Sequence, residues 1–210
     1  MTCLLILGAG GHGVVLAETA EETGLWDKIA FLDDKYPSIS TVAGWSVIGK
    51  VEMAIDLVDQ YFDAAIGIGD NLTRAKLLYQ VKQFGYRLPV IVHPSAYISK
   101  SAELGEGTVV FAQAAVNARA KIGCGSIINT GATVDHDCEL AQGVHISPGA
   151  HVAGEVKVGE FSWMGVGASV IPRIEIGKNV LVGAGSVIIR NISDGVVVVG
   201  NPGRTLKQNI

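Results

Sequence analysis

A histidine between two carboxylates is the strongest candidate for acid–base chemistry in this sequence. His136 lies in the segment Val134-Asp135-His136-Asp137-Cys138. A neighbouring carboxylate can orient an imidazole and make it a stronger base, which suits a general base in a proton transfer. A solvated surface histidine without a catalytic role is the alternative. The pattern alone leaves both interpretations open.

The remaining histidines of the C-terminal half have weaker claims to a function. His145 is expected to point outward, from a different face than His136. The two could share a cleft only if a neighbouring subunit closed it, so a pair of functional histidines would imply an oligomer. Without such a neighbour, His145 is a surface residue. His151 and His93 are interpreted as structural.

A glycine-rich loop near the N-terminus could bind phosphate. The apolar run Cys3–Leu7 leads into Gly8-Ala-Gly-Gly-His-Gly13 and a helix-like segment, and Ile29-Ala-Phe-Leu-Asp-Asp34 follows about 20 residues later. In such a pattern the glycines allow close approach to phosphate, the helix N-terminus favours negative charge, and the acid binds a ribose hydroxyl. The candidate ligand contacts are Gly10, Gly11, His12, Asp33 and Asp34.

Structural alternatives exist for part of this set. His12 could instead cap the helix that follows it, and Asp33 and Asp34 could cap or solvate a strand end. A further strand, Ala64–Ile68, ends in Gly69-Asp70-Asn71, at the edge where parallel sheets bind ligands. A second helix-like segment follows it. About 90 residues are too few for a complete dehydrogenase domain, so we interpret this half as a nucleotide or nucleotide-sugar site rather than an NAD site.

The second half of the chain has a six-residue repeat. Every sixth residue from Ile98 to Ile188 is aliphatic or methionine, and a small residue usually follows four positions later. This pattern predicts a parallel β-helix in which three short strands close a coil of about 18 residues. The repeated positions are Ile98, Leu104, Val110, Val116, Ile122, Ile128, Val134, Leu140, Ile146, Val152, Val158, Met164, Val170, Ile176, Val182 and Ile188.

The chain is therefore expected to contain two folded units and a tail. We predict an α/β Rossmann-like half domain over residues 1–93 and an all-β parallel β-helix over residues 94–193, followed by a C-terminal tail, 194–210. The expected helices are Gly13–Glu22 and Leu72–Phe84. Cys138 is expected to face the interior of the β-helix and to be inert.

Composition excludes several classes of protein. The 210 residues are 49% hydrophobic with a formal net charge of −4, which argues against nucleic acid and anionic membranes as partners. Three cysteines without a C-x-x-C spacing indicate neither a disulfide framework nor a structural zinc site, and we expect no metal. The apolar opening is too short for a signal peptide, and no run is long enough to span a membrane. A reducing, cytoplasmic location fits best.

Taken together, these motifs resemble a known family over nearly the whole chain. The sequence resembles the bacterial sugar acyltransferases of the left-handed β-helix superfamily. Within it, the resemblance is to the group with an N-terminal Gly-Ala-Gly-Gly-His-Gly domain, which includes the UDP-4-amino-sugar N-acetyltransferases of the bacillosamine pathway, the GDP-perosamine N-acetyltransferases and proteins described as sialic-acid O-acetyltransferases. The matching segments are Gly8–Gly13, Phe31–Asp34, Ile68–Asn71, His93-Pro94, Asn129–Asp137, the hexapeptides and Val199–Gly203.

This resemblance implies a homotrimer with acetyl-CoA in the cleft between adjacent subunits. His136 matches the family's general base, and Asp137 matches the acid that increases its basicity, although some relatives have Glu there. The implied acetyl-CoA contacts are His145, Gly154, Val166 and Ala184. The implied nucleotide-sugar contacts are Gly10, Gly11, His12, Asp33, Asp34 and Gly69.

The implied reaction is transfer of an acetyl group from acetyl-CoA to the amine of a nucleotide-linked sugar, with a UDP-4-amino-4,6-dideoxy sugar as the first candidate. GDP-perosamine is an alternative acceptor, and a sialic-acid or glycan hydroxyl is another. A non-catalytic β-helix scaffold is an alternative of a different class.

Overall fold

The computed structural model describes residues 2–208, which divide into two compact units. The first unit is Met1–Pro94 and the second is Ser95–Ile210. The boundary lies one residue beyond the expected end of the N-terminal unit at residue 93.

The N-terminal unit contains a mostly parallel sheet with the strand order β3-β4-β2-β1-β5. β1, β2 and β5 are parallel neighbours, as the sequence predicts. The β3–β4 hairpin, joined by Ala43 and Gly44, was not predicted. The elements are β1 (Cys3–Leu7), α1 (Gly11–Thr23), β2 (Lys28–Leu32), β3 (Thr41–Val42), β4 (Trp45–Gly49), the 3₁₀ helix η1 (Val51–Asp56), β5 (Asp63–Ile66), α2 (Asn71–Gln83) and β6 (Ile91–Val92).

Three glycines bring β1, α1 and β5 into close contact. A Cβ on Gly13 would collide with the Gly8 carbonyl oxygen, and a Cβ on Gly67 would lie 2.7 Å from the Gly13 Cα. Gly8 has a φ of +105°, in the region that favours glycine. Only glycine therefore allows α1 to begin this close to the carboxyl ends of the two strands. β5 ends at Ile66, before the expected Ile68.

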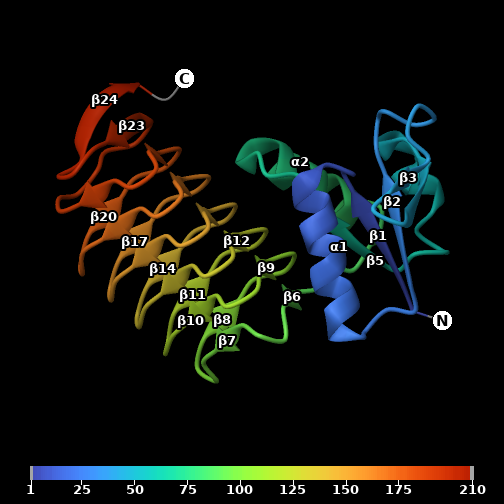
Figure 1. Ribbon diagram of the computed structural model, residues 1–210, viewed down its shortest axis with the longest axis horizontal. Coiled ribbons are helices and arrows are strands. Elements are labelled where there is room, and N and C mark those ends of the chain that lie inside the picture. Colours follow the sequence, from blue (N-terminus) through green and yellow to red (C-terminus); the bar gives the residue numbers. More distant parts are fainter. Residues whose placement is uncertain (1, 209–210) are drawn as a thin grey trace. The chain divides into compact units, whose positions relative to one another are not determined.

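The second unit is a parallel β-helix with three faces, whose coils stack from β7 to β22 (Figure 1). The β7 face consists of β7 (Tyr97–Ile98), β10 (Ala115–Val116), β13 (Thr133–Val134), β16 (His151–Val152), β19 (Ser169–Val170) and β22 (Val187–Ile188). The β8 face consists of β8 (Glu103–Leu104), β11 (Lys121–Ile122), β14 (Glu139–Leu140), β17 (Lys157–Val158) and β20 (Glu175–Ile176). The β9 face includes β9 (Val109–Val110), β12 (Ile127–Ile128), β15 (His145–Ile146), β18 (Trp163–Met164) and β21 (Leu181–Val182).

Residues 18 apart are in register in this unit, as the repeat predicts. Val116 pairs with Val134, and Val134 pairs with Val152. All three are at most 1% exposed, so the repeated aliphatic residues form the interior. Each coil also has residues with positive φ at its corners, which include Asp137 at +58°. Asp and Asn enter this region more easily than most residues with a Cβ.

The C-terminal segment, expected to be a tail, forms a hairpin as far as the structure describes it. β23 (Val196–Val199) pairs in parallel with β21, and β24 (Arg204–Gln208) pairs antiparallel with β23. The hairpin therefore extends the β9 face.

The glycine contacts predict that alanine lowers the stability of the protein at position 13 but not at position 11. Gly13→Ala is expected to lower the free energy of unfolding by about 1–3 kcal/mol, the usual cost of overpacking, because the new Cβ meets the Gly8 backbone. Gly11→Ala is the matched control, because a Cβ at Gly11 meets nothing within 4 Å. Urea denaturation of both variants measures the difference, and equal stability would contradict the packing.

Candidate active site

His136 lies at the corner that joins the β7 face to the β8 face, directly after β13. Its side chain is 51% exposed, and its Nδ1 lies 2.8 Å from Oδ2 of Asp137. Asp135 bonds instead to the backbone of His136, since its Oδ1 accepts the His136 N–H at 2.9 Å. Of the two flanking carboxylates, only Asp137 therefore bonds to the imidazole.

The Asp137 carboxylate fixes which ring nitrogen of His136 carries a proton. Arg119 donates to both oxygens of Asp137, from Nε at 2.6 Å and from Nη2 at 2.7 Å. The hydrogen bonds from Arg119 and then from His136 lower the pKa of the Asp137 carboxyl to about 2. An ionised carboxylate can only accept hydrogen bonds, so the neutral imidazole carries its proton on Nδ1. Nε2 is left as the basic atom.

Gly154, one coil above His136, leaves the space in which the imidazole lies. A Cβ at this position would be 2.6 Å from Nε2 and 2.7 Å from Cε1 of His136. Gly154 itself is buried although it lies at a corner. The ring therefore packs against the backbone of the next coil, with Nε2 beside it.

His145 lies on the outer side of β15, on the β9 face, and is only 5% exposed. Its ring stacks on Trp163, the residue in register on the next coil, with centroids 5.0 Å apart and planes at 13°. Nε2 of His145 also lies 3.1 Å from Nδ2 of Asn129. The outward direction was predicted, but the expectation of a surface residue was wrong. The sequence analysis missed Trp163 and Asn129, although the 18-residue spacing of His145 and Trp163 is visible in the repeat.

The three other expected acetyl-CoA contacts occupy two corners of the β-helix. Gly154 lies at the corner between the β7 and β8 faces, beside His136. Val166 and Ala184 are exposed and lie at the corner between the β9 and β7 faces. The two groups therefore flank the β7 face on its opposite sides.

The glycine loop presents open backbone at the carboxyl ends of β1 and β5. No atom lies within 4 Å of an ideal Cβ at Gly10, Gly11 or Gly69. Gly10 is the N-cap of α1, and its extended backbone places it before the first turn. The loop and the N-terminus of a helix of 13 residues thus leave open space in which an anion would fit.

Asp33 forms hydrogen bonds to the backbone of the glycine loop and of its own turn. Its Oδ2 accepts the Ala9 N–H at 2.8 Å, and its Oδ1 accepts the Lys35 N–H at 2.9 Å. Asp34 is exposed and accepts the Val51 N–H at 3.2 Å. Both carboxylates thus bond to this chain's own backbone, and Asp34 has the more accessible side chain.

His12 lies in the first turn of α1, and the expected alternative of a capping role is not observed. The N-cap is Gly10, and no side chain caps the helix. Burial and then the nearby Arg74 cation lower the pKa of His12 to about 4, so its imidazole is neutral at pH 7. Arg74, which the sequence analysis missed, is 2% exposed and donates to the Gly69 carbonyl at 2.8 Å. It also donates to Oδ1 of Asn71 at 2.7 Å.

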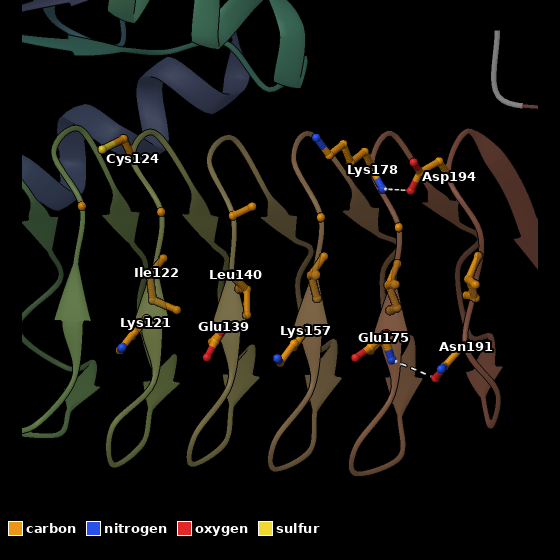
Figure 2. A pocket seen from close by; sticks show the side chains of 18 of the residues that line it. Lys121, Ile122, Cys124, Glu139, Leu140, Lys157, Glu175, Lys178, Asn191 and Asp194 are labelled. Carbon is orange, nitrogen blue, oxygen red and sulfur yellow. Dashed lines mark hydrogen bonds between the residues drawn. The ribbon is translucent and has the colours of Figure 1, made fainter.

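A groove of about 1010 Å³ runs along the β8 face, away from these groups. Figure 2 shows its row of outward side chains, in which Lys121, Glu139, Lys157 and Glu175 alternate in charge from coil to coil. None of the expected site residues lines it. The groove is therefore not part of the candidate active site, despite its size.

Residues 2–208 contain no evident metal site and no membrane-spanning helix. No group of three or more His, Cys, Asp or Glu side chains in this range is arranged to hold a metal ion. Within the same range, the helices are too short or too polar to cross a membrane.

Cys138 is fully buried, as expected, and burial raises the pKa of its thiol to about 11.

The buried state of His12 predicts a specific pH dependence of stability. Because its pKa is lowered from 6.5 to about 4 in the folded state, the unfolded chain takes up the proton first as the pH falls. The wild type should therefore lose stability between pH 6.5 and about 4 relative to His12→Gln, and the two should run parallel above that window. Urea unfolding across the range measures this. Parallel curves throughout would contradict the burial of His12.

Both units match known proteins. Residues 3–81 match the family described as the PglD N-terminal domain. UDP-N-acetylbacillosamine N-acetyltransferase from Bacillus subtilis (strain 168) is 39% identical over 114 residues, which are 53% of this chain and 52% of that protein. The matched region thus spans about half the length of this curated relative.

Solved structures match the whole chain. The acetyltransferase domain of PglB from Neisseria gonorrhoeae FA1090 is 42% identical with a TM-score of 0.95, over 98% of this chain and 100% of that chain. The same domain in complex with acetyl coenzyme A is 43% identical with a TM-score of 0.94, over 97% and 98% of the two chains. PerB from Caulobacter crescentus, in complex with CoA and GDP-perosamine, is 39% identical with a TM-score of 0.93, over 98% of each chain.

These matches confirm the expected fold class, a Rossmann-like α/β unit followed by a parallel β-helix. They also confirm the resemblance drawn from the sequence motifs. This chain belongs to the hexapeptide-repeat acetyltransferase superfamily, in the group that includes the PglB and PerB acetyltransferases.

Proposed function

We propose that this protein transfers the acetyl group of acetyl-CoA to the amine of a nucleotide-linked amino sugar. The His136–Asp137 pair carries the proposal, because it supplies an oriented base at an exposed corner of the β-helix. A UDP-4-amino-4,6-dideoxy sugar is the first candidate acceptor, in line with the activity named for the Bacillus subtilis relative. GDP-perosamine, which is bound in the PerB structure, is the second.

In this mechanism His136 acts as a general base on the sugar amine. Nε2 takes a proton from the amine as the nitrogen attacks the thioester carbonyl, and Asp137 holds the proton on Nδ1. When the tetrahedral intermediate collapses, the C–S bond breaks, and the CoA thiolate leaves and takes the proton from Nε2. A backbone amide at the corner would stabilise the negative charge that develops on the carbonyl oxygen. No acyl-enzyme is required, and Cys138 is unsuited to form one because its thiol is buried and mainly protonated.

The open glycine loop fits the nucleotide part of such a substrate. Gly10 and Gly11 would admit the phosphates at the N-terminus of α1, and Gly69 would lie against the same ligand. His12 is neutral and partly buried there, so it would act as a hydrogen-bonding group rather than as a cation. Asp34 is the carboxylate available for a ribose hydroxyl, while Asp33 holds the loop.

The positions of the expected acetyl-CoA contacts support a homotrimer. Gly154 on one side of the β7 face and Val166 and Ala184 on the other would meet in one cleft if copies packed through this face. None of the outward residues of its strands is Lys, Arg, Asp or Glu, whereas the strands of the β8 face carry outward Lys and Glu residues. Those of the β7 face are Tyr97, Ala115, Thr133, His151, Ser169 and Val187.

In the same cleft, His145 would be supplied by the copy that supplies Val166. Its low exposure leaves only its edge for a contact with acetyl-CoA, so Trp163 would keep the ring in place. We also propose a cytoplasmic location, since Cys3, Cys124 and Cys138, all within residues 2–208, form no disulfide and Cys124 is exposed, as suits a reducing compartment.

A thiol-release assay tests the function and the role of His136 together. With acetyl-CoA and a UDP-linked or GDP-linked amino sugar, the wild type should release CoA, and a sialic acid should give little. His136→Ala should lower kcat by about 10²–10⁴-fold, the usual contribution of a general base, with a much smaller effect on acetyl-CoA binding.

Gln142→Ala is the matched control. Gln142 is also an exposed corner residue, six positions after His136, and its side chain makes only a long hydrogen bond to Glu160, at 3.4 Å. Its kcat should equal that of the wild type. Activity of His136→Ala within about threefold of the wild type would remove His136 from the mechanism. Faster release with sialic acid than with any amino sugar would favour O-acetylation instead.

A further inference from the structure

Arg119 and His136 share one oxygen atom of Asp137. Nη2 of Arg119 lies 2.7 Å from Oδ2, and Nδ1 of His136 lies 2.8 Å from the same atom. Nε of Arg119 bonds to the other oxygen, Oδ1, at 2.6 Å. The carboxylate is thus held by a guanidinium fork on one side and by the imidazole on the other.

The coil geometry explains why Arg119 can reach Asp137. The two residues occupy equivalent corner positions on successive coils, with φ values of +61° and +58°. The Arg119 N–H bonds to Oγ of Ser101 at 3.1 Å, and the Asp137 N–H bonds to the Ala118 carbonyl at 3.0 Å. Both backbones are therefore fixed, and both side chains leave from the same corner.

A two-point contact restricts the carboxylate more than a single bond does. The planar guanidinium aligns with both oxygens and fixes the plane of the carboxylate as well as its position. The Asp137 side chain is 34% exposed, so without this contact it could rotate toward solvent. The direction in which Oδ2 faces Nδ1 of His136 would then be lost for part of the time.

We propose that Arg119 is a positioning residue that holds Asp137 so that His136 keeps its proton on Nδ1 and presents Nε2 as the base. The importance of this for catalysis rests on the proposed function, but the effect on the imidazole itself does not. Arg119 touches no reacting atom in this scheme. It acts only through Asp137.

The same corner provides a matched control two coils above Asp137. Arg173 also has a positive φ, at +64°, and its Nε bonds to Oε1 of Glu155 at 3.2 Å. The side chains of Arg119 and Arg173 are similarly exposed, at 66% and 78%. Arg173 forms its ion pair with Glu155, whereas Arg119 forms its ion pair with Asp137. Removing Arg173 therefore removes one exposed cation from this corner without removing the fork on Asp137.

The test combines kinetics with nitrogen-15 NMR of the His136 ring in Arg119→Met, Arg119→Lys and Arg173→Met. In Arg119→Met, we expect kcat to fall roughly 10–100-fold, the scale found when a hydrogen-bond partner that orients a metal-ligating histidine is removed. The KM for acetyl-CoA should change little. Arg119→Lys keeps the charge but not the fork, so it should recover part of the loss. Arg173→Met should match the wild type.

The NMR measurement is made without substrates, at a pH at which the imidazole is neutral. The wild type and Arg173→Met should show the proton on Nδ1, and Arg119→Met should show a mixture of the two tautomers. The wild-type tautomer in Arg119→Met would overturn the proposal, as would an equal loss of kcat in Arg173→Met. If the tautomer shifts as expected but even the wild type acetylates no amino sugar, the proposed function fails while the positioning role stands.

Discussion

The stacking of equivalent residues in successive coils is the constraint on which the rest of the structure depends. The interior aliphatic residues pair in strict register, as Val116, Val134 and Val152 do, and neighbouring strands are only about 4.8 Å apart. This leaves no freedom for one coil to shift against the next. The corners must then turn sharply, with a residue of positive φ in every one from Gly107 to Gly185, and their side chains line up along the axis of the β-helix.

The surroundings of His136 are built directly from this alignment. Arg119 comes from the coil below, Asp137 from the same corner, and the bare backbone of Gly154 from the coil above. The N-terminal unit achieves a similar effect by other means. There, close packing of Gly8 and Gly13 brings a helix N-terminus to the sheet edge, and the partly buried Asp33 carboxylate and the buried Arg74 guanidinium hold the adjoining loops.

The six-residue repeat was sufficient to predict the β-helix, because a period of this kind reports directly which residues face inward. It also predicted that His136 points outward, and the structure places this residue at a corner between β13 and β14. Sequence could not show that Asp33 bonds to the glycine loop or that Trp163 covers His145, because these depend on side-chain directions. The 18-residue spacing places Arg119 below Asp137, but spacing alone does not distinguish a bidentate ion pair from two solvated charges. The β3–β4 hairpin was missed because its two-residue first strand is too short to show a period.

The central claim is that stacked coils place Nε2 of His136 against the backbone of Gly154, where it acts as the base. Gly154→Ala tests this most directly, because the added Cβ would lie 2.6 Å from Nε2 and the imidazole would have to move, while the chain around it need not. Both kcat and the thermal midpoint of this variant are measured. We expect kcat to fall by about 10²-fold, as for a catalytic group displaced by about 1 Å, and the thermal midpoint to stay almost unchanged. A kcat equal to that of the wild type would contradict it.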